Sequence, residues 1–148
     1  MSNIGEIEED DILEIYTDGA CRNNPGKGAG AFLFVLNGEI IKQESIYFGH
    51  VTNNQAEYKA LINALEKAIE FKKYKIKVFS DSQLLVNQMN GIYKVGTPRI
   101  MILHLEAYEK AKGFENIEYL QVPRNNEYIK IADKLCSDCL RENFGSEV

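Results

Sequence analysis

The spacing of hydrophobic positions changes several times along the chain, and each change predicts an element. Residues 12–18 and 30–36 are apolar runs with the length and composition typical of strands, and residues 39–48 follow as a third. Asn37-Gly38, between the second and third runs, is a strong signal for a tight hairpin. The turn-rich residues 19–30 predict a loop. The first three strands are therefore expected to be antiparallel neighbours.

From residue 52 to residue 71 the apolar positions recur at helical spacing. Thr52 and Gln55 resemble a capping box at the start of this helix. The rest of the pattern predicts a strand, two helices, a strand and a helix, at residues 75–80, 82–90, 98–112, 117–122 and 128–141. This order, βββ-α-β-α-α-β-α, predicts an α/β fold in which helices pack on a mixed sheet.

The length of 148 residues suits one domain with a proper core. No apolar run approaches the ~20 residues that a membrane-spanning helix needs. The first 14 residues are acidic and contain no apolar stretch of the kind found in signal peptides. We therefore expect residues 1–11 to be a disordered acidic tail, residues 12–148 to be a single domain, and the protein to be cytoplasmic.

The net charge of −5 argues at first against a nucleic-acid partner, but its distribution weakens that argument. Six of the 22 acids lie within residues 1–14, which leaves 16 acids against all 17 bases in the remainder. Four of those 16 acids are candidate metal ligands, and bound metal would make their surface more positive. A modest basic surface for a polyanion is compatible with this composition.

Four acidic residues lie where a metal site could form. Asp18 and Asp81 each end a predicted strand, and their carboxylates would meet outside the strand ends if the two strands are parallel neighbours. Glu57 heads the apolar stripe of the 52–71 helix, and Asp133 lies on or beside the apolar face of the last helix. Because buried carboxylates are costly without positive charge among them, four converging acids without matching cations indicate divalent metal.

Each of these acids also has a structural explanation. Asp18 could be a residue at a strand-to-turn junction, and Asp81 could be the N-cap of the helix that follows. Glu57 could belong to a capping network or favour the helix dipole, and Asp133 could be a border residue beside lysines. For any single residue the structural explanation is about as good as the functional one. The four acids together favour a site.

The segments around these acids resemble the type 1 ribonuclease H family, including the related domains of reverse transcriptases. The resemblance covers residues 13–140 and is carried by Tyr16-Thr-Asp-Gly-Ala-Cys-Arg-Asn-Asn-Pro-Gly26, Thr52-Asn-Asn-Gln-Ala-Glu-Tyr58 and Ser80-Asp-Ser-Gln83. It implies an RNase H-like fold with a five-stranded mixed sheet, three antiparallel strands followed by parallel ones. Residues 12–148 would then be one catalytic domain.

The resemblance implies an endoribonuclease that hydrolyses the RNA strand of RNA–DNA hybrids and leaves 5′-phosphate and 3′-hydroxyl ends. Two Mg²⁺ ions, with Mn²⁺ as a substitute, would be the cofactor. By the family pattern, Asp18 would bridge both ions and Asp133 would complete the site of the ion on the nucleophile side. Glu57 and Asp81 would hold the other ion. The hybrid duplex would be the partner, and we expect no membrane association, no obligate protein partner and a monomer.

The resemblance also assigns substrate contacts beside the metals. By motif position, Asn24, Asn53, Asn54 and Gln83 would contact the minor groove, where 2′-hydroxyls distinguish RNA from DNA. Thr52 would help to hold a phosphate of the DNA strand. These amides and the hydroxyl can donate and accept hydrogen bonds, as recognition of a 2′-hydroxyl requires. Turn and cap chemistry is the alternative for the asparagines.

Two segments depart from the family pattern. Many members carry a histidine shortly before the last Asp, but residues 122–133 contain none and instead begin with a Val-Pro-Arg segment ending at Arg124. Arg124 is expected to steady the substrate phosphate or the leaving group, and a solvated loop arginine is the alternative. The Trp- and Lys-rich protrusion of many relatives is reduced to residues 91–99, so we expect weaker and more salt-sensitive hybrid binding. The cations left there are Lys94 and Arg99.

The three cysteines are expected to be structural. Cys136 and Cys139 form a C-x-x-C pattern in the last predicted helix, but no second Cys or His pair accompanies them as a zinc site would require. We therefore interpret them as small buried residues, with a redox role as the alternative. Cys21 falls in the glycine-rich loop, where the backbone is expected to matter more than the thiol.

Four other functions are alternatives to an endoribonuclease. A non-catalytic module of the same fold would have a broken carboxylate set. An exonuclease or junction resolvase would lack the Thr-Asn-Asn and Asp-Ser-Gln segments, and a structural interaction domain would have no reason to direct carboxylates inward. A catalytic domain detached from a reverse transcriptase is not excluded by the sequence.

Overall fold

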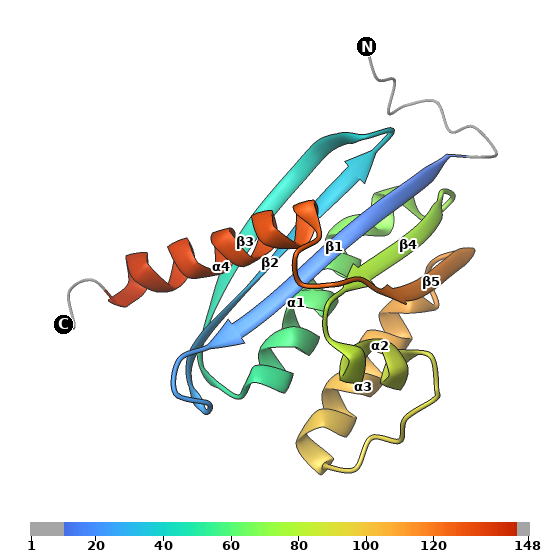
Figure 1. Cartoon of the computed structure of the whole chain (residues 1–148). Coiled ribbons are helices and arrows are strands. Elements are labelled where there is room, and N and C mark those ends of the chain that lie inside the picture. Colours follow the sequence, from blue (N-terminus) through green and yellow to red (C-terminus); the bar gives the residue numbers. More distant parts are fainter. Residues whose placement is uncertain (1–10, 145–148) are drawn as a thin grey trace.

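The computed structural model describes residues 11–144 and is built on one five-stranded sheet (Figure 1). Neighbouring strands follow the order β3-β2-β1-β4-β5. The pairs β1–β2 and β2–β3 are antiparallel, and the pairs β1–β4 and β4–β5 are parallel. This arrangement confirms the expected mixed sheet. The strands are β1 (Ile12–Cys21), β2 (Gly26–Leu36), β3 (Glu39–Val51), β4 (Lys75–Ser80) and β5 (Asn116–Gln121).

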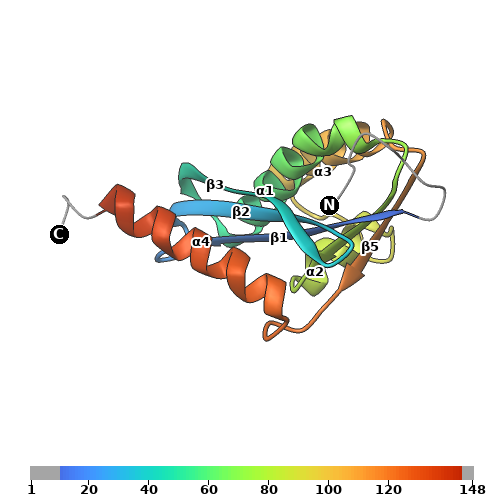
Figure 2. The ribbon, with the colours of Figure 1, turned by 90° about the horizontal axis from the view of Figure 1, so that it is seen from above.

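Helices cover both faces of the sheet, with α1 and α3 on one side and α4 on the other (Figure 2). Alternate residues of β1 supply both cores: Leu13 and Ile15 belong to the larger core under α1, while Tyr16 packs with Ile129 of α4. No helix within residues 11–144 is long and apolar enough to cross a membrane. The helices are α1 (Asn53–Ala68), the short 3₁₀ helix η1 (Ile69–Phe71), α2 (Gln83–Met89), α3 (Pro98–Ala111) and α4 (Glu127–Phe144).

Local signals in the sequence place most element boundaries correctly. Thr52 caps α1, because its hydroxyl accepts a hydrogen bond from the backbone N–H of Gln55 at 3.1 Å. In return, Oε1 of the Gln55 side chain accepts a hydrogen bond from the backbone N–H of Thr52 at 2.9 Å. Asn37 and Gly38 both have positive φ, at 51° and 80°, as the predicted hairpin requires. The capping box and the hairpin are therefore confirmed. The expected acidic tail lies outside the described residues, except for Asp11.

The first strand is longer than predicted, and this changes the place of Asp18. β1 continues to Cys21 and β2 already begins at Gly26, so residues 22–25 alone connect them. The glycines that looked like a loop signal instead allow close packing. A Cβ on Gly19 would lie 2.5 Å from the backbone of Ala56 in α1, so only glycine lets the helix approach the strand there. Asp18 therefore lies inside β1 and does not end it, contrary to the prediction.

Candidate metal centre

Three of the four predicted acids converge at one place in the fold. Asp18, Glu57 and Asp81 each offer a carboxylate oxygen, and these three atoms all lie within 4.8 Å of one another. Asp81 directly follows β4, and the last parallel pair between β1 and β4 joins Tyr16 to Phe79. Asp18 and Asp81 therefore lie just beyond the paired part of two parallel neighbours, as the sequence predicted for their carboxylates.

Glu57 reaches this cluster because α1 packs so closely on β1. Its position at the head of the apolar face of α1 agrees with the prediction, since Ala60, Leu61 and Ala64 on that face are buried. The missing side chain at Gly19 brings the first turns of α1 against the strand. The backbone N–H of Gly19 partly offsets the rise in the pKa of both Asp18 and Glu57. A single glycine thus lies beside both the acid of β1 and the acid of α1.

Asp133 lies at the rim of the site. It lines the same hollow of about 320 Å³ as the other three acids, but the residue is exposed and is not part of the tight cluster. The sequence allowed either an inward position or the border of the apolar face. The structure places Asp133 on the border, because α4 turns its apolar face, including Ala132 and Cys136, onto the sheet.

The electrostatics of the cluster are unfavourable to negative charge. Burial is the largest cause that raises the pKa of Asp18 to about 8, and repulsion from Asp81 and Asp133 adds to it. Burial also raises the pKa of Glu57 well above its usual value, followed by repulsion from Asp18 and Asp81. One oxygen of Glu57, Oε1, is sealed from solvent and has no hydrogen-bond partner among the described residues. This set of oxygens fits a divalent cation.

Arg124 does not neutralise the cluster. Its Nε lies 3.5 Å from Oδ2 of Asp81, but the Arg124 side chain is 92% exposed, whereas that of Asp81 is only 12% exposed. An ion pair with so exposed a partner contributes little to stability. Among the residues that the structure describes around this hollow, Arg124 is the only one with a positive charge. The carboxylates are therefore gathered without being held by matching cations.

The predicted substrate residues lie next to the acids. Asn53 lines the carboxylate hollow, and Gln83 is exposed at the start of α2, two positions after Asp81. A second hollow, of about 390 Å³, adjoins the start of α1. It is lined by Asn24, Pro25, Thr52, Asn54, Gln55, Thr97, Arg99 and Ile100.

Sequence reasoning missed that Thr97 and Arg99 belong beside Thr52. Thr97 is the N-cap of α3, and its hydroxyl accepts a hydrogen bond from the amide of Ile100. The Thr-Pro pair at this helix start was a visible signal for a cap, and Arg99 was recognised only as a remaining cation. Only the packing of α3 against α1 brings this cap to the hollow.

The two cysteines of α4 are buried and free, as expected. The Cys136 thiol lies 3.5 Å from the carbonyl oxygen of Asp18 and can donate to it. Burial raises the pKa of Cys136, so this thiol keeps its proton. Cys136 of α4 thus contacts the backbone of β1 at Asp18, on the face of the sheet opposite α1.

Comparison with known proteins identifies the same family along nearly all the described chain. The family model for RNase H matches residues 10–138. The ribonuclease HI of Halobacterium salinarum is 39% identical over 130 residues, which cover 86% of this chain and 64% of that protein. The N-terminal RNase H domain of a Mycobacterium tuberculosis protein, solved as a fusion with maltose-binding protein, is 30% identical with a TM-score of 0.86, covering 94% of this chain and 100% of that one.

A third similar structure was solved with nucleic acid. LC11-RNase H1, in complex with an RNA/DNA hybrid, is 33% identical with a TM-score of 0.80, covering 85% of this chain and 94% of that one. Some relatives are much longer than this chain. The matched part of this chain spans 35% of the length of three mycobacterial relatives, each of which is 38% identical to it.

Proposed function

This chain belongs to the RNase H family, and from that premise we propose that it hydrolyses the RNA strand of RNA–DNA hybrids. It acts as an endoribonuclease that leaves 5′-phosphate and 3′-hydroxyl ends, with residues 12–148 as its catalytic domain. The observation that carries this proposal is the cluster of Asp18, Glu57 and Asp81, gathered in one hollow without matching cations. The hybrid bound to LC11-RNase H1 supports the choice of substrate.

Enzymes of this family depend on metal, and the chain's own residues fit a metal site. We assign Asp18, Glu57, Asp81 and Asp133 as ligands of two Mg²⁺ ions, with Mn²⁺ as a substitute. The unpartnered oxygen of Glu57 and the raised pKa of Asp18 support this assignment, since both reflect missing positive charge. When bound, the ions would activate a water molecule and neutralise negative charge on the scissile phosphate and the leaving oxygen.

The protein groups around the acids bind and orient the RNA strand. Arg124 is exposed and already lies beside Asp81, so its planar guanidinium can turn to a phosphate oxygen of the substrate. Asp133 closes the acid set from the solvent side, where the nucleic acid must approach. The three clustered acids are held by β1, α1 and the end of β4, so their spacing is set by the fold.

The side-chain amides beside the acids distinguish the RNA strand of the hybrid from its DNA strand. The minor groove is contacted by Asn24, Asn53, Asn54 and Gln83, whose side-chain amides can form hydrogen bonds with the 2′-hydroxyls of RNA. Thr52 holds a phosphate of the DNA strand in the hollow of about 390 Å³. The presence of a hydroxyl from Thr97 and a guanidinium from Arg99 in the same hollow supports an anionic ligand there. These residues extend the binding surface away from the metals along the duplex.

One cleavage assay tests the proposal. The protein is incubated with end-labelled RNA–DNA hybrid, double-stranded RNA or single-stranded RNA, in Mg²⁺, Mn²⁺ or EDTA. We expect internal cuts in the RNA strand of the hybrid that disappear in EDTA. Trimming from the ends alone would indicate an exonuclease, and a folded protein that leaves the hybrid intact in both metals would contradict the proposal. Sizing of the products against alkaline ladders checks the predicted 5′-phosphate and 3′-hydroxyl ends.

A further inference from the structure

Two residues at or just after the end of β1 and one residue at the start of α1 form a hydrogen-bonded group beside the acids. Cys21 ends β1, Asn24 lies in the following turn, and Asn53 begins α1. Oδ1 of Asn53 accepts from the backbone N–H of Cys21 at 3.1 Å and lies 3.2 Å from its sulfur. Oδ1 of Asn24 accepts from the backbone N–H of Asn53 at 3.0 Å and lies 3.7 Å from the same sulfur. The Cys21 thiol therefore faces both amide oxygens.

These contacts determine which end of each amide faces inward. A backbone N–H can only donate, so the atom that meets it must be the side-chain oxygen of the asparagine. The first N–H of α1 also has no partner within the helix, and Asn24 satisfies it. The inward-facing atoms of Asn24 and Asn53 are therefore both Oδ1. Their Nδ2 groups remain available to a ligand, and both residues are exposed.

We propose that Cys21 is a positioning residue that holds both amides with their Nδ2 donors toward the substrate. This inference rests on the proposed function, because it takes the hybrid duplex as the ligand. Donors at these two positions match the acceptors of a minor groove, namely the 2′-oxygen of ribose and the O2 or N3 atoms of bases. Asn53 presents its donor at the carboxylate hollow, and Asn24 presents its donor at the neighbouring one.

The thiol itself is suited to this role and not to chemistry. Burial raises the pKa of Cys21, so the sulfur keeps its proton near neutral pH and can donate. Removal of the thiol leaves the backbone N–H of Cys21 in place, so Asn53 loses one of two restraints and Asn24 loses one contact. The consequence is weaker substrate binding, while the acids that carry the reaction are untouched.

The test measures steady-state cleavage of the hybrid by Cys21→Ala and Cys21→Ser in Mg²⁺. For Cys21→Ala we expect a KM increase of roughly threefold to tenfold, the range for one lost hydrogen bond, with kcat changed by less than about twofold. Cys21→Ser keeps a donor at this position and should restore KM to within about twofold of the original protein. Cys139→Ala is the matched control, because it removes a thiol that lies among the packing residues of α4.

A mutant cycle with Asn24→Ala/Asn53→Ala, which removes both amides, separates positioning from a direct contact. If Cys21 acts through these two amides, adding Cys21→Ala to the Asn24→Ala/Asn53→Ala variant should change KM by less than about 1.5-fold. Equal effects of Cys21→Ala in both backgrounds would overturn the inference, as would an unchanged KM in the single variant or a lower kcat at constant KM. Failure of the original protein to cleave the hybrid would instead overturn the proposed function, and the positioning role with it.

Discussion

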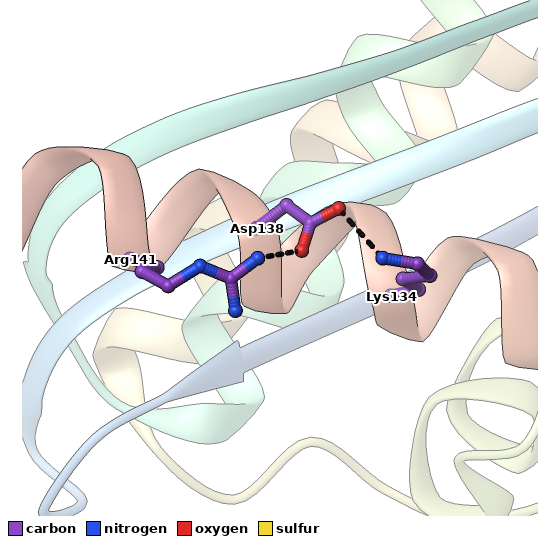
Figure 3. A network of polar contacts seen from close by, with 3 residues as sticks. All are labelled: Lys134, Asp138 and Arg141. Atoms are coloured by element: carbon purple, nitrogen blue, oxygen red, sulfur yellow. Dashed lines mark hydrogen bonds and ion pairs between the residues drawn. The ribbon is translucent and has the colours of Figure 1, made fainter.

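The acidic residues in two regions of this protein have opposite surroundings. On the outer face of α4, Asp138 lies between Lys134 and Arg141, with Nζ of Lys134 3.2 Å from its Oδ2 (Figure 3). Hydrogen bonding to Lys134 is the largest cause that lowers the pKa of Asp138. In the central cluster, where α1 packs on β1, Asp18 and Glu57 lie among other acids, and burial raises the pKa of both.

The difference separates an acid that is paired within its own helix from acids that are gathered without matching cations. Asp138 is on the surface and satisfied by its own helix, so it needs nothing further. The central cluster costs the metal-free protein stability, since its charges are partly desolvated and repel each other. Such an arrangement is expected at a functional site, where an added cation offsets the repulsion.

The largest expected effect comes from replacing one member of the central cluster. Asp18→Asn keeps the shape of the side chain but removes a negative oxygen, so we expect cleavage of the hybrid to fall by about 10³-fold or more, because the metal contribution is worth several kcal/mol. The matched change Asp138→Asn should leave the rate within about twofold. Initial rates at saturating Mg²⁺ measure both. Equal losses in the two variants would remove the contrast between the two regions.

The second effect is on stability without metal. Because the pKa of Asp18 is about 8 in the folded protein, the folded state binds more protons than the unfolded state between about pH 4 and pH 8. Stability in EDTA should therefore fall as pH rises through this window. Asp18→Asn should flatten that dependence and raise the free energy of unfolding at pH 8 on the order of 2 kcal/mol.

Urea unfolding in EDTA at pH 5 and pH 8 measures this effect. Mg²⁺ should stabilise the original protein at pH 8 and stabilise Asp18→Asn much less. Asp138→Asn serves as the control and should show the pH dependence of the original protein. A protein whose stability in EDTA rises from pH 5 to pH 8, with no difference in Asp18→Asn, would contradict the account of the central cluster.

The smallest expected effect concerns the one arginine beside the cluster. Arg124→Ala should lower kcat by about tenfold, the value of one charge-assisted hydrogen bond to a phosphate, while the Mg²⁺ concentration for half-maximal rate changes by less than about twofold. Rates across a Mg²⁺ titration measure both quantities. Arg124→Lys tests whether charge alone is sufficient. An unchanged kcat in Arg124→Ala would remove Arg124 from the mechanism.

Signals that act over a few residues were read correctly from the sequence. The capping box of Thr52 and Gln55, the Asn37-Gly38 hairpin and the strand at residues 75–80 all depend on neighbours within a few positions. The inward direction of Glu57 follows from the period of its own helix. Such features could be predicted because their physical causes lie in the segment itself.

Asp18 and Cys21 show where local signals were insufficient. The glycine-rich stretch after Asp18 has the composition of a loop, and only the approach of α1 to Gly19 shows that it is a strand under a helix. Cys21 gains its role from an asparagine 32 positions away, and Thr97 and Arg99 gain theirs from the packing of α3. All of these partners are far apart in the sequence, so patterns over a few neighbouring residues could not predict the contacts.

The amino-acid sequence alone therefore determined the order of the elements, their caps and turns, and the acids available for a metal, because periodicity and local hydrogen bonding act within short segments. The tertiary structure decided which oxygens come within 4.8 Å of each other, that Asp133 stays at the rim, and which way the amides of Asn24 and Asn53 face. The physical reason is that burial, charge repulsion and long-range hydrogen bonds depend on distances between segments, and only the folded chain sets those distances.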